Sequence, residues 1–328
     1  MAGIKDIAKE AGVSISTVSY ALNGSPKVTE KTRQRIVKIA EELNYVPNAA
    51  ARTLKTRKTH IIGAFLGDYS GSFYGELLKG INQELVDTGY ELIVCNGPES
   101  HRLMTERMVD GALILGHRFT QEQILEFADR GHPLTMLDRE IEHPNISCVL
   151  LDNQIGMNQE MDAILETNPN QIHLVNGPVG NHDAVERRKV VVERANAAGV
   201  AVREWNGEFT KRSGIRAASE LLEVIQESDA IICLNDDMAL GVYDVLQNFS
   251  LRIGEDISLV GFDKLEITNY TQPRIASVSY SKPDWGKKAA RALLHLIEAK
   301  ENSKQKIPSK FIKDASIRKK ITKIKYVL

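Results

Sequence analysis

The chain has 328 residues, of which 42 % are hydrophobic and 26 % charged, values typical of a globular protein with two or three domains. It has no run of about 18 apolar residues, which excludes a membrane helix. Its start, MAGIKDIAKE, lacks the apolar segment of a secretory signal peptide. Cys95, Cys148 and Cys233 lie in apolar stretches without metal-binding spacing. We therefore expect a cytoplasmic protein with no metal, no cofactor and no membrane partner.

The net charge of −1 conceals an uneven distribution. Residues 1–60 hold eleven Lys/Arg and five Asp/Glu, a balance of +6, and the remainder holds 31 against 38, a balance of −7. A basic first segment indicates that this part of the chain meets a polyanion. The acidic body is expected to have a different task.

Three short helical patterns follow one another in the basic segment. Gly12 ends the first, Ser14 or Ser16 can cap the second, Asn23 with Gly24 stops it, and Thr29 caps the third. Two short helices joined by a glycine-containing turn predict a helix-turn-helix. The apolar faces are formed by Ile4, Ile7 and Ala8, by Val18, Ala21 and Leu22, and by Ile36, Ile39, Ala40 and Leu43.

In a helix-turn-helix domain the second helix enters the major groove of DNA. Ile15, Ser16 and Tyr20 would then face base edges, whereas Thr17 and Ser19 would serve phosphates or packing. A small helical bundle that binds another protein is the alternative. The positive charge of the segment favours DNA.

The segments IKDIAKEAGVSISTVSYALNG and VTEKTRQRIVKIAEELNYVPNAAARTL resemble the DNA-binding head of the lac repressor/galactose repressor (LacI/GalR) family, over residues 3–60. This resemblance implies a bacterial, nucleoid-associated homodimer on a palindromic operator. It assigns residues 1–47 to the helix-turn-helix domain and 48–60 to a hinge helix and linker.

The same resemblance implies that the hinge helix inserts Leu54 into the minor groove, with Arg52 and Lys55 beside it, while Tyr45 and Asn48 contact the DNA backbone. About eight residues are too few for a stable isolated helix. Folding of the hinge would therefore be driven by binding to DNA.

Beyond residue 60, buried strand patterns alternate with amphipathic helices, which predicts parallel sheets flanked by helices. The alternation restarts midway, so the predicted fold class is an all-α helix-turn-helix head plus an α/β body with two Rossmann-like lobes of periplasmic-binding-protein type. The core of residues 61–328 is divided into a first lobe of about 61–155 and 281–310 and a second lobe of about 156–278 and 311–328.

Polar residues stand where these strands end, and ligands bind there in such sheets. Carboxylates accept hydrogen bonds from sugar hydroxyls, an arginine donates to them, and an aromatic ring can stack on the sugar. For each residue taken singly, a capping or solvated role is the alternative. The strand-end candidates include Asp68, Asp138, Arg139, Asp236 and Asp263, with Phe209 as the aromatic.

The motifs NDDMALG and GEDISLVGFD resemble the effector-binding core of the same family. That resemblance places effector contacts on Asp138, Arg139, Arg187, Phe209 and Asp236, with Tyr74 in the wall of the first lobe. The sequence departs from the family pattern at PESHRLMTER, where one helix is trimmed, and at Val190, where a glycine is usual.

These features predict a sequence-specific transcription regulator, a repressor of carbohydrate-utilisation genes. Its operator affinity would be controlled by a sugar or sugar phosphate between the lobes. A regulator that depends on a corepressor or a partner protein is the open alternative. A periplasmic sugar-binding protein would need a signal peptide, and no nucleophile–base pair or phosphate-binding loop supports an enzyme. The apolar spacing after residue 316 is too short for a coiled coil, so we expect a dimer without a tetramerising tail.

Overall fold

The computed structural model describes residues 2–46, 53, 56–69, 71–116 and 119–319. The chain divides into two compact units, Met1–Thr59 and His60–Leu328, here called the head and the body. Of the predicted DNA contacts, Asn48, Arg52, Leu54 and Lys55 lie outside the described residues. So does most of the apolar repeat predicted near the C-terminus.

The head contains three helices around a small core. The Ser14 hydroxyl accepts a hydrogen bond from the Thr17 amide (3.1 Å), so Ser14 rather than Ser16 caps the second helix. Gly12 ends the first helix with φ 61°, a left-handed conformation that glycine adopts without strain. Ile7, Val18 and Ile36, one from each helix, are fully buried. The helices are α1 (Ile4–Ala11), α2 (Ile15–Leu22) and α3 (Glu30–Glu42).

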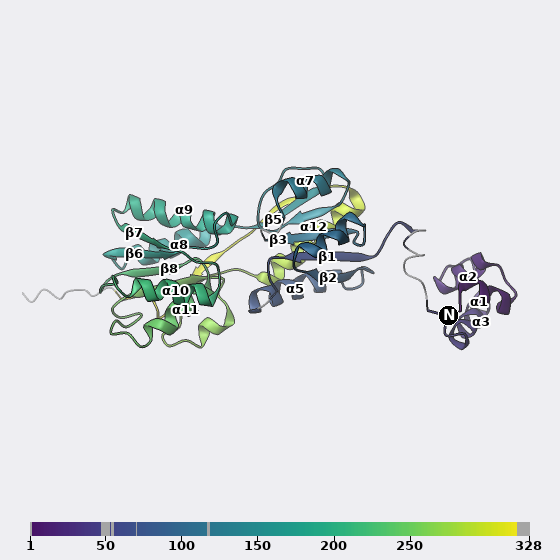
Figure 1. The fold of residues 1–328 in the computed structure, drawn as a ribbon, viewed down its shortest axis with the longest axis horizontal. Helices are drawn as coiled ribbons and strands as arrows, with labels where there is room; N and C mark the ends of the chain where they lie inside the picture. Colours follow the sequence, from purple (N-terminus) through teal and green to yellow (C-terminus); the bar gives the residue numbers. More distant parts are fainter. Residues whose placement is uncertain (1, 47–52, 54–55, 70, 117–118, 320–328) are drawn as a thin grey trace, which may run out of the picture. The chain divides into compact units, whose positions relative to one another are not determined.

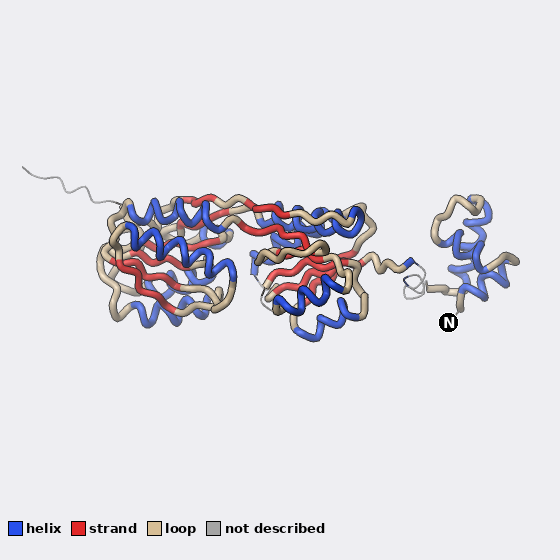
Figure 2. Tube along the Cα trace, turned by 90° about the horizontal axis from the view of Figure 1, so that it is seen from above, coloured by secondary structure: helices blue, strands red, loops and turns tan. Residues whose placement is uncertain are grey.

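The body contains two six-stranded sheets, one in each lobe (Figures 1 and 2). All pairings are parallel except that of β12 with β10, which is antiparallel. The first sheet has the order β11 (Lys304–Ile307), β5 (Ile146–Leu151), β4 (Leu134–Met136), β3 (Gly111–Leu115), β1 (Ile61–Leu66), β2 (Glu91–Cys95). The second has the order β12 (Lys310–Ile312), β10 (Ala276–Ser279), β9 (Ser258–Phe262), β8 (Ala230–Cys233), β6 (Gln171–Val175), β7 (Ala201–Trp205).

Helices cover both faces of each sheet, because central strands such as β3 and β9 are buried throughout. Figure 1 shows α9 on one side of the second sheet and α10 with α11 on the other. The first lobe has α5 (Gly71–Leu85), η1 (Pro98–His101), α6 (Arg102–Thr105), α7 (Gln121–Asp129) and α12 (Lys282–Ala299). The second has α8 (Asn153–Leu165), α9 (His182–Ala197), α10 (Lys211–Leu221), α11 (Asp236–Leu246) and η2 (Glu266–Asn269).

Each lobe contains a helix pair that crosses at two facing glycines. A Cβ on Gly80 of α5 would lie 2.0 Å from the Pro283 carbonyl oxygen, and one on Gly286 of α12 would lie 2.2 Å from that of Leu77. Gly214 of α10 and Gly241 of α11 form the equivalent crossing in the second lobe. These backbones approach so closely that a side chain would push the helices apart.

The chain passes between the two sheets three times, after β5, after β10 and after β11. Because the chain crosses in this way, the C-terminal ends of strands from both lobes face one another. The structure confirms the predicted fold class. The trimmed segment PESHRLMTER forms only η1 and the one-turn helix α6. No helix within the described ranges is both long and apolar enough to cross a membrane.

Candidate functional site

The exposed side of α2 carries the residues predicted to face DNA bases. Ile15 is 45 % exposed and Tyr20 36 % exposed, and Ser16 between them is also exposed. The Lys27 ammonium lies 5.1 Å from the centre of the Tyr20 ring. This side of the helix therefore offers apolar, hydroxyl and cationic groups to a partner.

Two other residues predicted to contact DNA, Thr17 and Tyr45, make contacts within the head. The Thr17 hydroxyl is 2.8 Å from that of Ser14 within the N-terminal cap of α2. Tyr45 is half-buried and packs against the core of the head. Arg35 donates a hydrogen bond to the Ala11 carbonyl (2.7 Å), which fastens α3 to the end of α1.

The body contains a cavity of about 420 Å³ lined by residues of both lobes. Nearly every strand end in its wall is the carboxyl end of a parallel strand, as expected for a ligand site in this architecture. The first lobe contributes Gly67, Asp68, Gly71, Phe73, Tyr74, Leu115, Gly116, Asp138 and Trp285, and the second contributes Pro178, Asn181, Asp183, Arg187, Glu208, Phe209, Thr210, Lys211, Asn235, Asp237, Asp263 and Tyr280.

The first-lobe wall is built from the ends of β1, β3 and β4 and the start of α5. Asp138 follows β4, and its carboxylate accepts hydrogen bonds from the Gly116 amide (2.9 Å) and from Arg139 Nε (3.3 Å). Phe73 and Tyr74 pack edge to face, with ring centres 4.8 Å apart. Six of the eight predicted effector residues line the cavity: Asp68, Tyr74, Asp138, Arg187, Phe209 and Asp263.

Arg187 of α9 is a buried cation in the second-lobe wall, 4 % exposed. Its Nε donates to Asn153 Oδ1 (2.9 Å), its Nη1 donates to the Leu234 carbonyl (2.7 Å), and its guanidinium lies 3.5 Å from the centre of the Phe262 ring. These contacts fix the direction of the guanidinium before any ligand arrives.

Asp263 and Phe209 occupy left-handed backbone conformations, with φ 109° and φ 58°. Such conformations cost bulky residues energy and persist only where the surroundings enforce them. The Tyr280 hydroxyl donates to the Asp263 carboxylate (2.6 Å), and Asn235 Nδ2 donates to the Phe209 carbonyl (3.0 Å). Gly177 lets the Phe209 ring lie on its backbone, because a Cβ there would be 2.5 Å from the ring.

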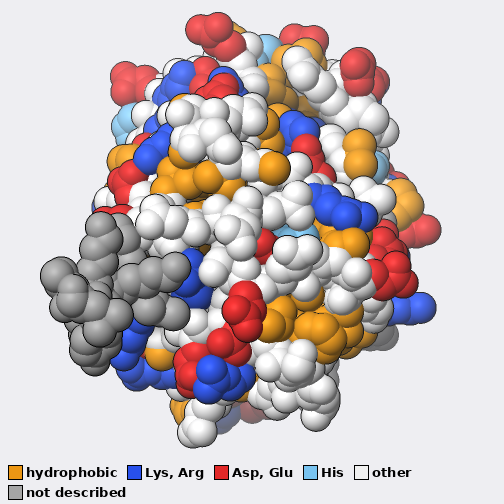
Figure 3. All heavy atoms as spheres, turned by 90° about the vertical axis from the view of Figure 1, so that its left-hand side faces the viewer, with side chains coloured by type: hydrophobic (Ala, Val, Ile, Leu, Met, Phe, Trp, Pro, Cys, Tyr) orange, Lys and Arg blue, Asp and Glu red, His pale blue; other side chains and the backbone are white. Residues whose placement is uncertain are grey.

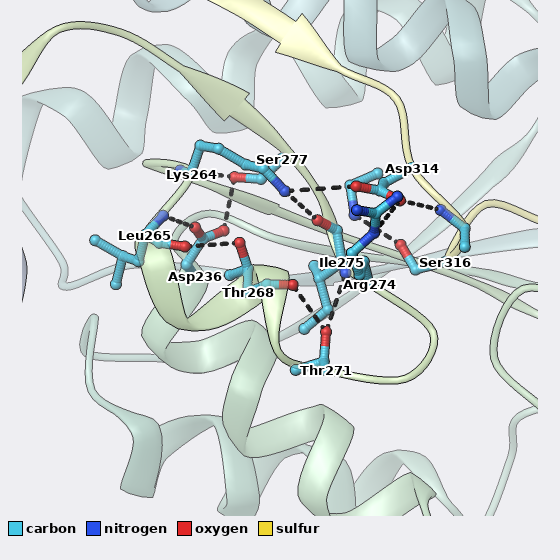
Figure 4. Close-up of polar contacts among 12 residues, drawn as sticks. Asp236, Lys264, Leu265, Thr268, Thr271, Arg274, Ile275, Ser277, Asp314 and Ser316 are labelled. Atoms are coloured by element: carbon cyan, nitrogen blue, oxygen red, sulfur yellow. Dashed lines mark hydrogen bonds and ion pairs between the residues drawn. The ribbon is translucent and has the colours of Figure 1, made fainter.

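Two predicted effector residues, Arg139 and Asp236, do not line the cavity. Arg139 Nη2 donates to the Gly116 carbonyl (2.7 Å) and holds the loop behind Asp138. Asp236 is completely buried, and its carboxylate accepts from the Leu265 amide and the Ser277 hydroxyl, both at 2.7 Å (Figure 4). Direct contact of these two residues with an effector stays a prediction, and Asp237, the neighbour of Asp236, lines the cavity in its place.

The cavity is a region of negative potential. Burial raises the pKa of Tyr74 to about 12, and the carboxylates of Asp68, Asp263 and Asp237 add to the rise. Burial also raises the pKa of Asp138, with Asp183 of the other lobe contributing in the same direction. Carboxylates from both lobes thus act on each other across the cavity. In the described part of the chain, no cluster of three or more His, Cys, Asp or Glu side chains is arranged to hold a metal ion.

The structure also adds cavity residues that the sequence did not point to, among them Phe73, Asn181, Asp183, Glu208 and Lys211. Asn181 and Thr210 are the N-caps of α9 and α10. A polar capping residue in the loop between a strand and the next helix was the available sequence signal. Tyr280 and Trp285 come from segments remote in sequence, so no local pattern could have placed them here.

A helix-turn-helix head followed by a two-lobed binding body defines a ligand-responsive DNA-binding protein. Comparison with known families gives the same result. The family model of the bacterial regulatory proteins of the lacI family matches residues 3–48, and that of the periplasmic binding protein-like domain matches residues 162–316.

Three relatives extend the match to most of the chain. The HTH-type transcriptional repressor PurR of Vibrio atlanticus (strain LGP32) is 32 % identical over 317 residues, which cover 93 % of this chain and 95 % of that protein. The probable HTH-type transcriptional repressor ExuR of Bacillus subtilis (strain 168) is 30 % identical, with coverage of 94 % and 95 %. The crystal structure of a sugar-binding transcriptional regulator from Enterococcus faecalis is 39 % identical with a TM-score of 0.76, covering 80 % of this chain and all of that one.

The chain therefore belongs to the lacI family of bacterial transcription regulators. Its relatives are named as repressors and regulators, so this is a family of DNA-binding proteins rather than enzymes. The resemblance predicted from the sequence is confirmed.

Proposed function

We propose that this protein is a sequence-specific repressor of carbohydrate-utilisation genes, acting in the bacterial cytoplasm. A sugar or sugar phosphate in the cavity between the lobes would control its affinity for the operator. The observation that carries the proposal is the cavity itself, where carboxylates, a fixed arginine and aromatic rings from both lobes converge. These are the groups that recognise hydroxyl-rich rings. The sugar-binding relative from Enterococcus faecalis supports the same ligand class.

The distribution of charge and exposed groups supports DNA binding by the head. Residues 1–60 carry the excess of +6, and α2 presents Ile15, Ser16 and Tyr20 to solvent. The face of the second lobe drawn in Figure 3 shows charges of both signs mixed with apolar groups. Among its described residues this face has no basic patch, and the positive excess lies in residues 1–60, so we assign the DNA contact to the head.

An exposed apolar edge of the first lobe supports a homodimer. β2 is an edge strand of the first sheet, and its Ile93 and Val94 are each 38 % exposed. Val86 and Met108 nearby in sequence are 59 % and 41 % exposed. Edge strands of this kind pair readily with a second chain. A two-fold dimer would place two heads on the halves of a palindromic operator.

Control of DNA affinity would follow from linkage between the two sites. A ligand that contacts residues of both lobes favours whichever arrangement brings its partners together. It then changes operator affinity only as far as it binds the free and DNA-bound forms differently. A ligand that weakens operator binding acts as an inducer, and one that strengthens it acts as a corepressor.

The experiment selects operator sequences from random palindromic DNA with the full-length protein and measures their affinity by fluorescence anisotropy. The Ser16→Ala/Tyr20→Ala double variant should lose at least about tenfold in specific affinity, because it removes groups predicted to face base edges. Val37→Ala, an exposed apolar residue of α3, is the matched control and should bind as the wild type does. Equal binding by the double variant would contradict the assignment. Sugars are then added to the wild-type complex, and failure of every sugar to change its affinity would contradict sugar control.

A further inference from the structure

The charges around the cavity decide which of the two proposed ligand classes, a sugar or a sugar phosphate, the cavity can bind. Six carboxylates and two cations are present among the described residues that line it. The carboxylates are Asp68, Asp138, Asp183, Glu208, Asp237 and Asp263, and the cations are Arg187 and Lys211. A phosphate group would bring close to two further negative charges into this setting.

Neither cation is placed to compensate an anionic ligand. Lys211 Nζ lies 2.7 Å from the Asp244 carboxylate, and this pair is about half exposed. Arg187 already donates to Asn153 and to the Leu234 carbonyl. Burial raises the pKa of Asp263, and the positive charge of Arg187 opposes this rise, so that charge already acts on a carboxylate of the protein before a ligand binds.

Three helices of the second lobe begin at the cavity, and helix N-termini ordinarily attract anions. Here the chain supplies the anions itself. Asp183 lies in the first turn of α9, and Asp237 lies in the first turn of α11. Glu208 precedes α10 by three residues, and its amide donates to Ser213 Oγ in the first turn. The positive ends of α9 and α11 are therefore compensated before a ligand binds, and Glu208 adds a carboxylate to the cavity wall near the start of α10.

The caps of these helices also occupy amides that a phosphate would need. The Ala184 amide donates to Asn181 Oδ1 (3.0 Å), the Ser213 amide to Thr210 Oγ1 (3.2 Å), and the Met238 amide to Asn235 Oδ1 (3.0 Å). A phosphate site needs several amides that point together at one anion. The cavity instead offers hydrogen-bond acceptors, because each carboxylate can accept hydrogen bonds from more than one hydroxyl group.

From these contacts we infer that the ligand carries no negative charge: the cavity selects neutral or amino-substituted sugars and rejects the corresponding phosphosugars and uronic acids. This inference rests on the proposed function and deepens it. Phe73, Tyr74 and Phe209 provide apolar ring faces for the carbon skeleton, and the surrounding carboxylates accept from its hydroxyls. A protonated amino group is tolerated because the field around it is negative.

The test uses matched sets of sugars on the full-length protein. D-glucose, D-galactose, D-ribose and cellobiose are compared by thermal shift and calorimetry with glucose 6-phosphate, galactose 6-phosphate, ribose 5-phosphate, glucuronate, galacturonate, glucosamine and galactosamine. In the set of any ring that binds, the neutral or amino form should bind at least about tenfold more tightly than the anionic form. An anionic form that binds as tightly as its neutral parent overturns the inference while leaving sugar control intact.

A pair of variants separates charge from shape. The double variant Glu208→Gln/Asp237→Asn neutralises two cavity carboxylates with little change of volume. The ratio of the affinity for the neutral sugar to the affinity for the anionic sugar should therefore fall several-fold. Glu220→Gln removes an exposed carboxylate of α10 outside the cavity and should leave the ratio unchanged. An equal ratio in all three proteins would mean that charge does not set the selectivity. If no sugar of any kind stabilises the wild type while operator binding persists, the proposed sugar control fails, and the inference fails with it.

Discussion

The Asp236 carboxyl group is enclosed in the second lobe. It is completely buried behind the cavity, where burial raises its pKa to about 8 and the nearby Asp263 adds to the rise. The hydrogen bonds from Ser277 and Leu265 oppose this shift without cancelling it. In the unfolded chain an aspartate titrates near its usual value of about 3.9. Between these two values the folded protein holds a proton that the unfolded chain has lost.

This difference predicts a stability that falls as pH rises through that interval. Because the folded state binds more protons, the free energy of unfolding decreases with pH, by at most about 4 kcal/mol between pH 5 and 8. Asp236→Asn removes this titration, and its amide can accept from the Leu265 amide and donate to Ser277 Oγ. The melting temperature of the variant relative to the wild type should therefore rise by several degrees from pH 5 to pH 8. A constant difference, measured by calorimetry across this range, would show that Asp236 is ionised in the folded protein.

At the scale of the element, replacement by alanine should change the stability of the body in opposite directions at two glycines of α5. Gly80→Ala places a methyl group against the backbone of α12, and overpacking of this kind costs about 1–3 kcal/mol or more. A methyl group added to Gly75, on the same helix, would meet no neighbouring atom within 4 Å, and the backbone there is not left-handed. Gly75→Ala should therefore stabilise the body by about 0.5–1 kcal/mol. Urea unfolding of both variants measures the difference, and similar losses would contradict the glycine crossing.

The elements that the sequence revealed are those with one clear periodicity. Strands such as β3 and β9 are continuous apolar runs, and α5 and α10 have apolar stripes, so all were predictable. The helix α8 has no such stripe in the sequence, because it is buried on several sides. Its Asn153, Gly156 and Glu160 are as enclosed as its methionines, which leaves no stripe to detect.

The same limit applies to the site. The carboxylates at strand ends were predictable because parallel strands end at one edge of a sheet. The choice between Asp236 and Asp237 was not, since successive residues at the start of a helix point about 100° apart. Only the packing of α11 against β9 decides which of the two faces the cavity. The wall formed by Tyr280 and Trp285 depends on the second crossing of the chain between the sheets, which no local pattern specifies.

At the scale of the whole molecule, the proposed repressor has to be a dimer to read a palindrome. The bodies would meet through the exposed apolar edge at β2, because an unpaired strand with Ile93 and Val94 open to solvent is a surface that pairs with another copy. Two heads held together gain affinity from their joint binding, so loss of the dimer also weakens operator binding.

Ile93→Asp should disrupt this edge, because a carboxylate buried in the contact would be left without a partner. We expect sedimentation to show a dimer for the wild type and a predominant monomer for the variant, with operator affinity reduced at least about tenfold. Ile215→Asp, at a position of α10 with nearly the same exposure of 39 %, is the matched control and should remain dimeric. If the Ile215→Asp variant dissociates and the Ile93→Asp variant remains a dimer, the interface lies on the second lobe and the prediction is wrong.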